Sequence, residues 1–157
     1  MTIAWTYLLY AYYRSTGVEY RYYEKRGKRR VFNRVDGRYR YWELRRCISI
    51  KECSLDRGTV LNLQFLIGLR DEIEHVRAEV LDTYLSGRYQ ACVLNYNHYL
   101  KQFFGNKYGL DEHVAYSIQL SELGFQQAQA MAKAEAALPK RIHSYIAGFD
   151  SELSDDD

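Results

Sequence analysis

Hydrophobic side chains recur along most of this chain at three- and four-residue steps, which is the spacing of one face of an α-helix. The first such stretch predicts a helix over Ile3–Tyr13, ended by Gly17. Its buried face is predicted to consist of Trp5, Leu8, Leu9 and Tyr12. The apolar run before Arg14 is too short to span a membrane and lacks the basic start and cleavage site of a signal peptide. We therefore expect a core helix and no membrane segment.

The strongest helical pattern lies in the middle of the chain, over Leu61–Val80. Ser54 or Asp56 is placed to cap this helix, and its apolar stripe is predicted to be Val60, Leu63, Ile67 and Ile73. Ser86-Gly87 interrupts the periodicity, so a separate helix is predicted over Arg88–Phe104. Glu43–Ile50 is predicted to be a short helix or the approach to one. Further helices are predicted over Leu110–Leu123, Phe125–Leu138 and, after Pro139, Lys140–Phe149.

A different period appears between the first two helices. From Tyr20 to Tyr41, aromatic residues alternate with polar ones at the two-residue period of a β-strand. Turn residues at 25–28 and at Asp36-Gly37 divide this stretch, and the second is a strong hairpin signal. The sequence therefore predicts one antiparallel hairpin or a three-stranded meander over about residues 18–42, too small to be a domain of its own.

Length and composition fit one mainly α domain. The 157 residues include a single proline and 10 glycines, and 47% are hydrophobic against 27% charged. We expect an antiparallel helical bundle over residues 1–150 that carries the β insert. Residues 151–157 are expected to be a disordered acidic tail.

The net charge of +2 conceals an uneven distribution. Between Arg14 and Arg46 there are 12 Lys and Arg residues against 4 acidic ones, a local charge of +8. The rest of the chain carries 10 basic and 16 acidic residues, a charge of −6. A basic segment of this kind indicates a polyanionic partner.

The basic segment interleaves arginine with tyrosine, which favours RNA as that partner. Single-stranded RNA offers base faces to aromatic rings and phosphates to cations. The candidate RNA-binding residues are Arg21, Tyr22, Arg38, Arg40 and Tyr41. In the alternative interpretation, the tyrosines cover the helical core and the arginines only remain in water; the pattern leaves both open.

No metal site or cofactor site is predicted. Cys47, Cys53 and Cys92 lack the paired spacing of a zinc site, and we expect reduced, mostly buried thiols in a cytoplasmic protein. His113 and His143 have no acidic or cysteine partner at ligand spacing. The chain also lacks a glycine-rich phosphate loop, a Walker motif and a serine-hydrolase motif.

The candidate catalytic residues, Arg70 and His75, lie where the apolar run of the central helix gives way to charge. A guanidinium can hold a phosphodiester while an imidazole moves protons near neutral pH. On a regular helix these two side chains point about 140° apart. Cooperation therefore requires a loosened last turn or a second subunit across a two-fold axis. In the structural alternative, Arg70 pairs with Glu74 and His75 lies near Asp71.

Asn95 and His98 fall near the apolar side of the predicted helix Arg88–Phe104. Polar groups there are more often core hydrogen-bonders or dimer contacts than catalytic groups. If antiparallel packing of the two long helices brings Asn95 beside Arg70, we expect its amide to orient the arginine or a phosphate.

At Arg70, Asp71 and His75 the sequence resembles the RNase-type members of the HEPN superfamily. These carry an arginine, usually a polar residue directly after it, and a histidine four to six intervening positions later. The stretches NLQFLIGLRDEIEH and GRYQACVLNYNHYLKQFFG are similar to a prokaryotic domain-of-unknown-function branch of that superfamily, and the similarity runs from Thr2 to about Gly105. Relative to that branch the chain looks N-terminally truncated, since it begins inside the first apolar helix.

The resemblance implies an all-helical domain and RNA cleavage by a homodimer without a metal, often in toxin or phage-defence settings with an antitoxin or other regulatory partner. In this hypothesis His75 acts as general base or acid, Arg70 neutralises the scissile phosphate, and Asp71, Glu74 and Asn95 support them. The second hypothesis is a non-catalytic nucleic-acid or nucleotide-binding module. A dimerisation or antitoxin-binding scaffold is the third.

Overall fold

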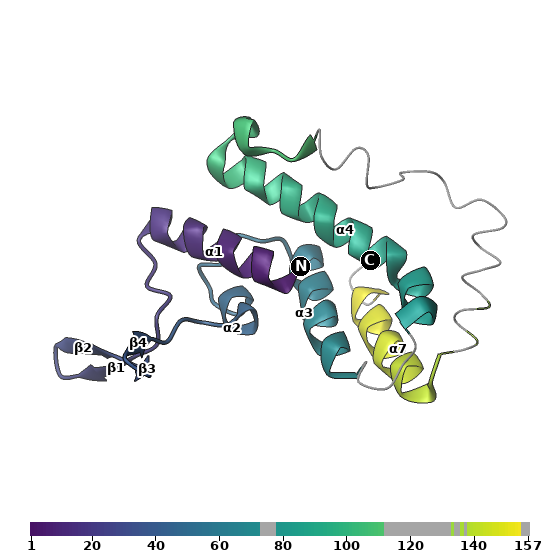
Figure 1. The fold of residues 1–157 in the computed structure, drawn as a ribbon, viewed down its shortest axis with the longest axis horizontal. Helices are drawn as coiled ribbons and strands as arrows, with labels where there is room; N and C mark the ends of the chain where they lie inside the picture. Colours follow the sequence, from purple (N-terminus) through teal and green to yellow (C-terminus); the bar gives the residue numbers. More distant parts are fainter. Residues whose placement is uncertain (73–77, 112–132, 134–135, 137, 155–157) are drawn as a thin grey trace. The chain divides into compact units, whose positions relative to one another are not determined.

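The computed structural model describes residues 1–72, 78–111, 133, 136 and 138–154 (Figure 1), with the backbone alone for the helical segments 70–72, 78–84 and 152–154. The chain forms two compact units, Met1–Leu55 and Asp56–Asp157, where the sequence predicts one domain. It is mainly helical with small antiparallel hairpins, which confirms the predicted class. The type of helical bundle stays a prediction.

The first unit begins with α1, Thr2–Thr16. Its buried residues are Trp5, Leu8, Leu9 and Tyr13. Tyr13 takes the buried place predicted for Tyr12, which is only half-buried, because the Tyr13 hydroxyl donates inward to the Cys47 carbonyl at 2.7 Å. Gly17 ends the helix as predicted, in the left-handed conformation with φ 75°.

Two β-hairpins follow α1. Antiparallel strands β1 (Tyr23–Arg26) and β2 (Arg29–Phe32) form the first, and β3 (Arg34–Val35) and β4 (Arg38–Tyr39) form the second. Both turns lie where the sequence predicts them. Gly27 has φ 59°, and Asp36 and Gly37 have φ 50° and 77°, the positive values that two-residue hairpin turns require.

Main-chain hydrogen bonds join the two hairpins. The Tyr22 N–H donates to the Arg40 carbonyl at 2.9 Å, the Arg40 N–H to the Asn33 carbonyl at 2.9 Å, and the Asn33 N–H to the Tyr22 carbonyl at 2.8 Å. An antiparallel bridge between Arg21 and Tyr41 closes the insert. We call residues 21–41 the ribbon. The structure thus has two linked hairpins where the sequence predicts one hairpin or a meander.

The short helix α2 (Leu44–Ile48) packs against α1 and completes the core of the first unit (Figure 1). Burial, and then the charge of Glu43, raises the pKa of the Cys47 thiol to about 12, so this thiol stays protonated at neutral pH. None of the three cysteines forms a disulfide with another described residue; Cys47 and Cys92 are buried and Cys53 is half-buried.

The second unit begins with α3, Arg57–Glu72, which is capped by Asp56 as one of the two predictions has it. The Asp56 carboxylate accepts from the Thr59 N–H at 2.9 Å and from the Thr59 hydroxyl at 2.7 Å. It also accepts from the Tyr99 hydroxyl at 2.6 Å, so the cap ties the start of α3 to the second long helix.

Removal of the Asp56 cap is expected to lower the stability of the fold by an amount that depends on pH. Burial alone would raise the pKa of Asp56, but hydrogen bonds from Tyr99 and Thr59 outweigh burial and hold it below its ordinary value. The carboxylate therefore stabilises the fold above about pH 4, and this contribution is lost as the pH falls through the lowered pKa. We expect Asp56→Ala to lower the free energy of unfolding by about 0.5–2 kcal/mol at pH 7. Urea denaturation should show this difference shrinking towards pH 3, and a constant difference would contradict the role of the charge.

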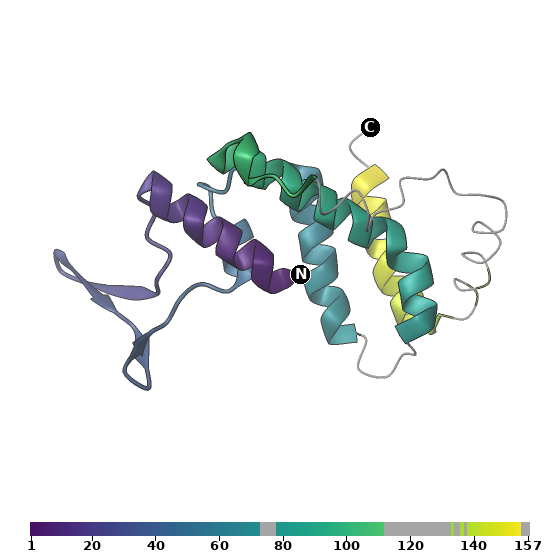
Figure 2. The same cartoon turned by 45° about the horizontal axis from the view of Figure 1, so that its top comes forward.

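The buried face of α3 differs from the predicted stripe. Leu63 is buried as predicted, but Val60 and Ile67 are half-buried. Ile73, the fourth predicted residue, lies outside the described part of the chain. Phe65 and Leu69 are buried instead. The reason is that α3 packs against two helices, α4 and α7, so its buried surface is wider than one stripe (Figure 2).

The helix α4, Ala78–Phe104, runs without a break through Ser86 and Gly87, so the predicted interruption there is wrong. One glycine inside a helix costs about 1 kcal/mol relative to alanine, which packing on either side can offset. Leu85 and Cys92, which flank it, are buried. The helix ends before Gly105, whose φ is 100°, and a 3-10 helix η1 (Asn106–Tyr108) follows.

The last helix, α7 (Lys140–Ser154), begins directly after Pro139 as predicted and continues into the segment predicted as a tail. It joins α3 and α4 in one buried cluster of Phe65, Leu69, Leu85, Leu138, Ile142 and Ile146. The predicted helices over Leu110–Leu123 and Phe125–Leu138 fall largely outside the described residues. In the part of the chain that is described, no helix has the length and apolar character needed to cross a bilayer.

Candidate nucleic-acid interface

The predicted catalytic residues lie around the end of α3. Arg70 and Asp71 belong to its last turn, where only the backbone is described. Glu74 and His75 fall within residues 73–77, outside the described part of the chain. The pairing of Arg70 with His75 therefore stays a prediction. Among the described residues, no group of three or more His, Cys, Asp or Glu side chains is arranged to hold a metal ion.

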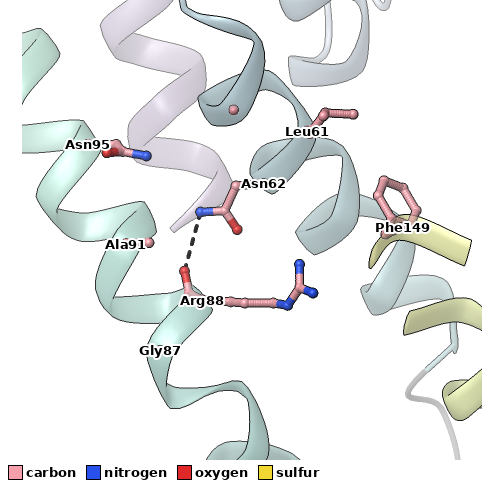
Figure 3. Close-up of a pocket in the computed structure, with 8 residues that line it drawn as sticks. Leu61, Asn62, Gly87, Arg88, Ala91, Asn95 and Phe149 are labelled. Carbon is pink, nitrogen blue, oxygen red and sulfur yellow. Dashed lines mark hydrogen bonds between the residues drawn. The ribbon is translucent and has the colours of Figure 1, made fainter. Parts of the chain in front are cut away.

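Asn95, predicted to support Arg70, lines a hollow of about 240 Å³ in the second unit (Figure 3). The hollow lies beside the first turns of α3, where Asn62 is its polar residue. Arg70 follows eight residues later, about 12 Å along the helix at 1.5 Å per residue. Asn62 therefore lies about two helical turns from Arg70, and the contact of Asn95 with Arg70 stays a prediction.

Asn62 and Arg88 are polar residues of this hollow that the sequence pattern does not single out. The Asn62 amide nitrogen donates to the Arg88 carbonyl at 3.3 Å, and Asn62 Oδ1 is buried without a partner among the described residues (Figure 3). The Arg88 guanidinium lies 4.2 Å from the centroid of the Phe65 ring and pairs with Asp150. A guanidinium held on both sides has a structural role, so this hollow does not have the character of a phosphate site.

The predicted RNA-binding residues all lie in the ribbon, but on two faces. Arg21 and Tyr41 are bridge partners, and the side chains of paired residues share a face. Tyr22 and Arg40 are each one position further along and lie on the other face, where the Arg40 guanidinium is 4.7 Å from the centroid of the Tyr22 ring. Arg38 is exposed at the start of β4.

The face that carries Arg21 alternates arginines with aromatic rings. Four cation–π pairs build it, with these distances from guanidinium to ring centroid: Arg21 over Phe32 at 4.1 Å and over Tyr39 at 5.1 Å, Arg34 over Tyr39 at 4.4 Å and Arg30 over Tyr23 at 4.9 Å. Each such pair contributes about 0.5–1 kcal/mol at an exposed site. We call these six residues the stacked face.

The stacked face has the chemistry of a surface for unpaired RNA. A guanidinium that stacks on a ring keeps N–H donors at its edge for a phosphate. Arg30 and Arg34 are exposed, and 37% of Tyr39 is exposed. The candidate residues chosen from the sequence include only Arg21 of this face and omit Tyr23, Arg30, Phe32, Arg34 and Tyr39. The two-residue period of the strand, which puts positions 30, 32 and 34 on one side, is the signal that identifies them.

Arg21 is less available to RNA than the exposed arginines. Its Nε and Nη2 donate to the two carboxylate oxygens of Glu19 at 2.7 and 2.8 Å. The hydrogen bond from Arg21 holds the pKa of Glu19 below its ordinary value, so the carboxylate stays charged at neutral pH. A phosphate must displace Glu19 to use this guanidinium fork, and we expect a smaller contribution from Arg21 than from Arg30 or Arg34.

Comparisons with known proteins place the chain in one family. No curated protein and no solved structure matches it. A family model described as Domain of unknown function (DUF3644) matches residues 1–153, which span both compact units. Because this match covers nearly the whole chain, the protein belongs to the DUF3644 family.

Proposed function

We propose that the protein is an RNA-binding endoribonuclease that needs no metal ion and works as a homodimer. The observation that carries RNA binding is the stacked face, in which exposed arginines alternate with aromatic rings. Cleavage rests on the resemblance of Arg70, Asp71 and His75 to RNase-type HEPN domains. Binding and cleavage can be tested separately.

The ribbon suits single-stranded RNA better than a duplex. Unpaired bases offer faces that can stack on Tyr39 and Tyr41, of which 37% and 44% are exposed. Phosphates between the bases would meet the three arginines of the stacked face and the predicted Arg38 and Arg40. Because the segment from Arg14 to Arg46 carries a charge of +8, we expect binding to weaken steeply as salt is added.

In the proposed reaction, the ribose 2′-oxygen attacks the adjacent phosphorus while the bond from phosphorus to the 5′-oxygen breaks. The products are a 2′,3′-cyclic phosphate and a 5′-hydroxyl. His75 removes the proton from the 2′-hydroxyl or protonates the leaving 5′-oxygen, and Arg70 neutralises the charge that develops on the phosphate. Asp71 and Glu74 orient these two residues. Since a regular helix directs Arg70 and His75 apart, the twin subunits supply the shared cleft.

The biological setting follows from the same resemblance. A nuclease of this kind would act in the cytoplasm as a toxin or in defence against phage. An antitoxin or another regulatory protein would hold it in check. In this setting, expression of the protein is expected to inhibit growth. Coexpression of a protein encoded beside it is expected to relieve that inhibition.

A cleavage assay without divalent ions tests the proposed function. Purified protein in EDTA is expected to cut single-stranded RNA and to leave DNA of the same sequence intact, because DNA lacks the 2′-hydroxyl nucleophile. Denaturing gels with end-labelled strands measure both. Cleavage that appears only after a divalent ion is added, or that affects DNA equally, would contradict the proposed reaction.

A second candidate function is a non-catalytic nucleic-acid-binding module. It is favoured by the division of the chain, because the stacked face belongs to the first compact unit and Arg70 to the second. In this case RNA binding survives His75→Ala and falls with salt, and no RNA product forms with or without metal. The gel assay separates the two candidates directly.

A further inference from the structure

Two adjoining hollows lie in the first unit, beside α1 and the ends of the ribbon. The first, of about 570 Å³, is lined mainly by the tyrosines Tyr7, Tyr10, Tyr20 and Tyr41, and we call it the tyrosine hollow. The second, of about 500 Å³, is lined by Arg14, Arg21, Arg30 and one acid, Glu19, and we call it the arginine hollow. Arg14, Tyr20 and Tyr41 line both, so the two hollows meet at these residues.

The rings of the tyrosine hollow are held in place before any ligand binds. Tyr10 and Tyr20 stack with centroids 4.6 Å apart and planes at 21°. The Tyr41 ring lies 5.6 Å from Tyr20 and 5.8 Å from Tyr10. The Tyr10 hydroxyl donates to the Trp42 carbonyl, and burial, followed by the neighbouring thiol and phenols, raises its pKa to about 12, so it keeps the proton that it donates.

These rings remain open to a further ring. Tyr41 is 44% exposed and Tyr7 is 66% exposed, and both line the hollow. Large exposed aromatic surface lowers stability in water unless something covers it. The Tyr7 ring stands at 84° to Tyr10, so it forms a side wall to the Tyr10–Tyr20 stack. A flat aromatic group fits such an angle between rings.

The arginine hollow is cationic, whereas the tyrosine hollow is aromatic. Its three guanidinium groups face one carboxylate, and Glu19 is already engaged by Arg21. Arg14 and Arg30 are exposed. An arginine presents several N–H donors in one plane, which matches the oxygens of a phosphate. This half of the pair is therefore suited to a phosphate group.

We propose that the two hollows together bind one unpaired nucleotide, with its base on the rings of the tyrosine hollow and its phosphate in the arginine hollow beside Arg14. A nucleotide joins a flat ring and a phosphate through one sugar, and here an aromatic wall and a cationic wall meet at Arg14 and Tyr41. This inference rests on the proposed RNA binding for its substrate class. It adds a site, centred on Arg14 and Tyr41, that adjoins the stacked face and shares Arg21 and Arg30 with it.

The same chemistry has two sources, a nucleotide within an RNA strand and a free nucleotide. Fluorescence anisotropy with a labelled ten-nucleotide single-stranded RNA tests the first, with the full chain and its variants. Tyr41→Leu and Arg14→Gln are each expected to weaken binding by about tenfold or more, because Tyr41 is an exposed ring for the base and Arg14 is an exposed guanidinium for the phosphate where the two hollows meet. Direct binding of fluorescently labelled AMP to the same proteins tests the free nucleotide.

Matched variants separate this site from general charge and general aromaticity. Arg26→Gln removes one exposed arginine from the same basic ribbon, and Tyr108→Leu removes one exposed ring outside the hollows. Each control is expected to change the affinity for RNA by less than about threefold, because neither residue lines the proposed nucleotide site. Circular dichroism and thermal melting establish that all four variants keep the fold.

Each outcome bears on a different statement. If the wild type binds RNA and Tyr41→Leu and Arg14→Gln bind it equally well, the nucleotide site is wrong while the proposed function stands. If duplex RNA binds as tightly as single-stranded RNA, base stacking in the tyrosine hollow is wrong. If AMP binds in a manner that depends on Arg14 and Tyr41 but RNA does not bind, the site is right for a free nucleotide and the proposed RNA function fails.

Discussion

Replacement of His75 by alanine is expected to reduce RNA cleavage by about 100- to 10,000-fold, the usual contribution of a general acid or base. Binding of the same RNA should stay within about threefold of wild type, because the proposed binding surfaces belong to the first unit and His75 to the second. Single-turnover cleavage rates and anisotropy measured on one preparation give both values. A loss confined to cleavage is the signature of a chemical role.

His98→Ala is the matched control for this prediction. His98 is an exposed histidine of α4 in the same unit, so its removal changes the same chemical group without touching the end of α3. We expect cleavage by this variant to match wild type. If His75→Ala cleaves as fast as His98→Ala, His75 is not catalytic and the non-catalytic module becomes the better account.

Gly68→Ala is expected to lower the free energy of unfolding by about 1–3 kcal/mol, although alanine is the better helix former. A Cβ at position 68 would overlap the Tyr145 hydroxyl. That side chain cannot move aside cheaply, because its hydroxyl donates to the Phe65 carbonyl at 2.8 Å and its ring packs 5.1 Å from Phe149. Urea denaturation of the variant beside wild type measures the cost.

Two further variants establish the cause of this loss. Gly148→Ala places the same methyl group in α7, where no described residue outside the neighbouring helix backbone lies within 4 Å, and is expected to stabilise the protein by about 0.5–1 kcal/mol. Tyr145→Phe removes the overlapping oxygen, so Gly68→Ala made in that background should cost much less than in wild type. An equal cost in both backgrounds would show that α3 and α7 do not pack at Gly68 and Tyr145 as described.

Local signals account for most of the element boundaries. Gly17 ends a helix because only a left-handed residue completes that cap, and Asp36-Gly37 makes a hairpin because both residues accept a positive φ. Asp56 begins α3 because its carboxylate satisfies N–H groups of the first turn. Each of these effects acts within four residues, which is why the sequence alone predicts it.

Buried faces are less predictable, because they depend on helices that are distant in sequence. Phe65 is buried because α7, more than 70 residues later, covers that side of α3. The helix α4 passes through Gly87 because packing of its neighbours outweighs a local preference of about 1 kcal/mol. The periodicity of hydrophobic residues along one helix contains no information about either contact.

The candidate functional site likewise has one part that the local sequence predicts and one part that it does not. Alternation of tyrosine and arginine in the ribbon predicts an aromatic, cationic surface, and the stacked face has that character. The tyrosine hollow was not predictable in this way, since it brings Tyr10 of α1 against Tyr20 and Tyr41 across up to 31 positions. Arg70 and His75 are predicted from the change from apolar to charged residues in the central helix and from the resemblance, and their relative geometry is still a prediction.

The most direct test of the proposed function is the chemistry of the ends that it leaves on RNA. Mass spectrometry of products made in EDTA is expected to find a 2′,3′-cyclic phosphate on one fragment and a 5′-hydroxyl on the other. A single 2′-deoxy nucleotide at the cut position should abolish cleavage there. Fragments that end in a 3′-hydroxyl and a 5′-phosphate, or cleavage that continues past the 2′-deoxy substitution, would contradict attack by the 2′-oxygen.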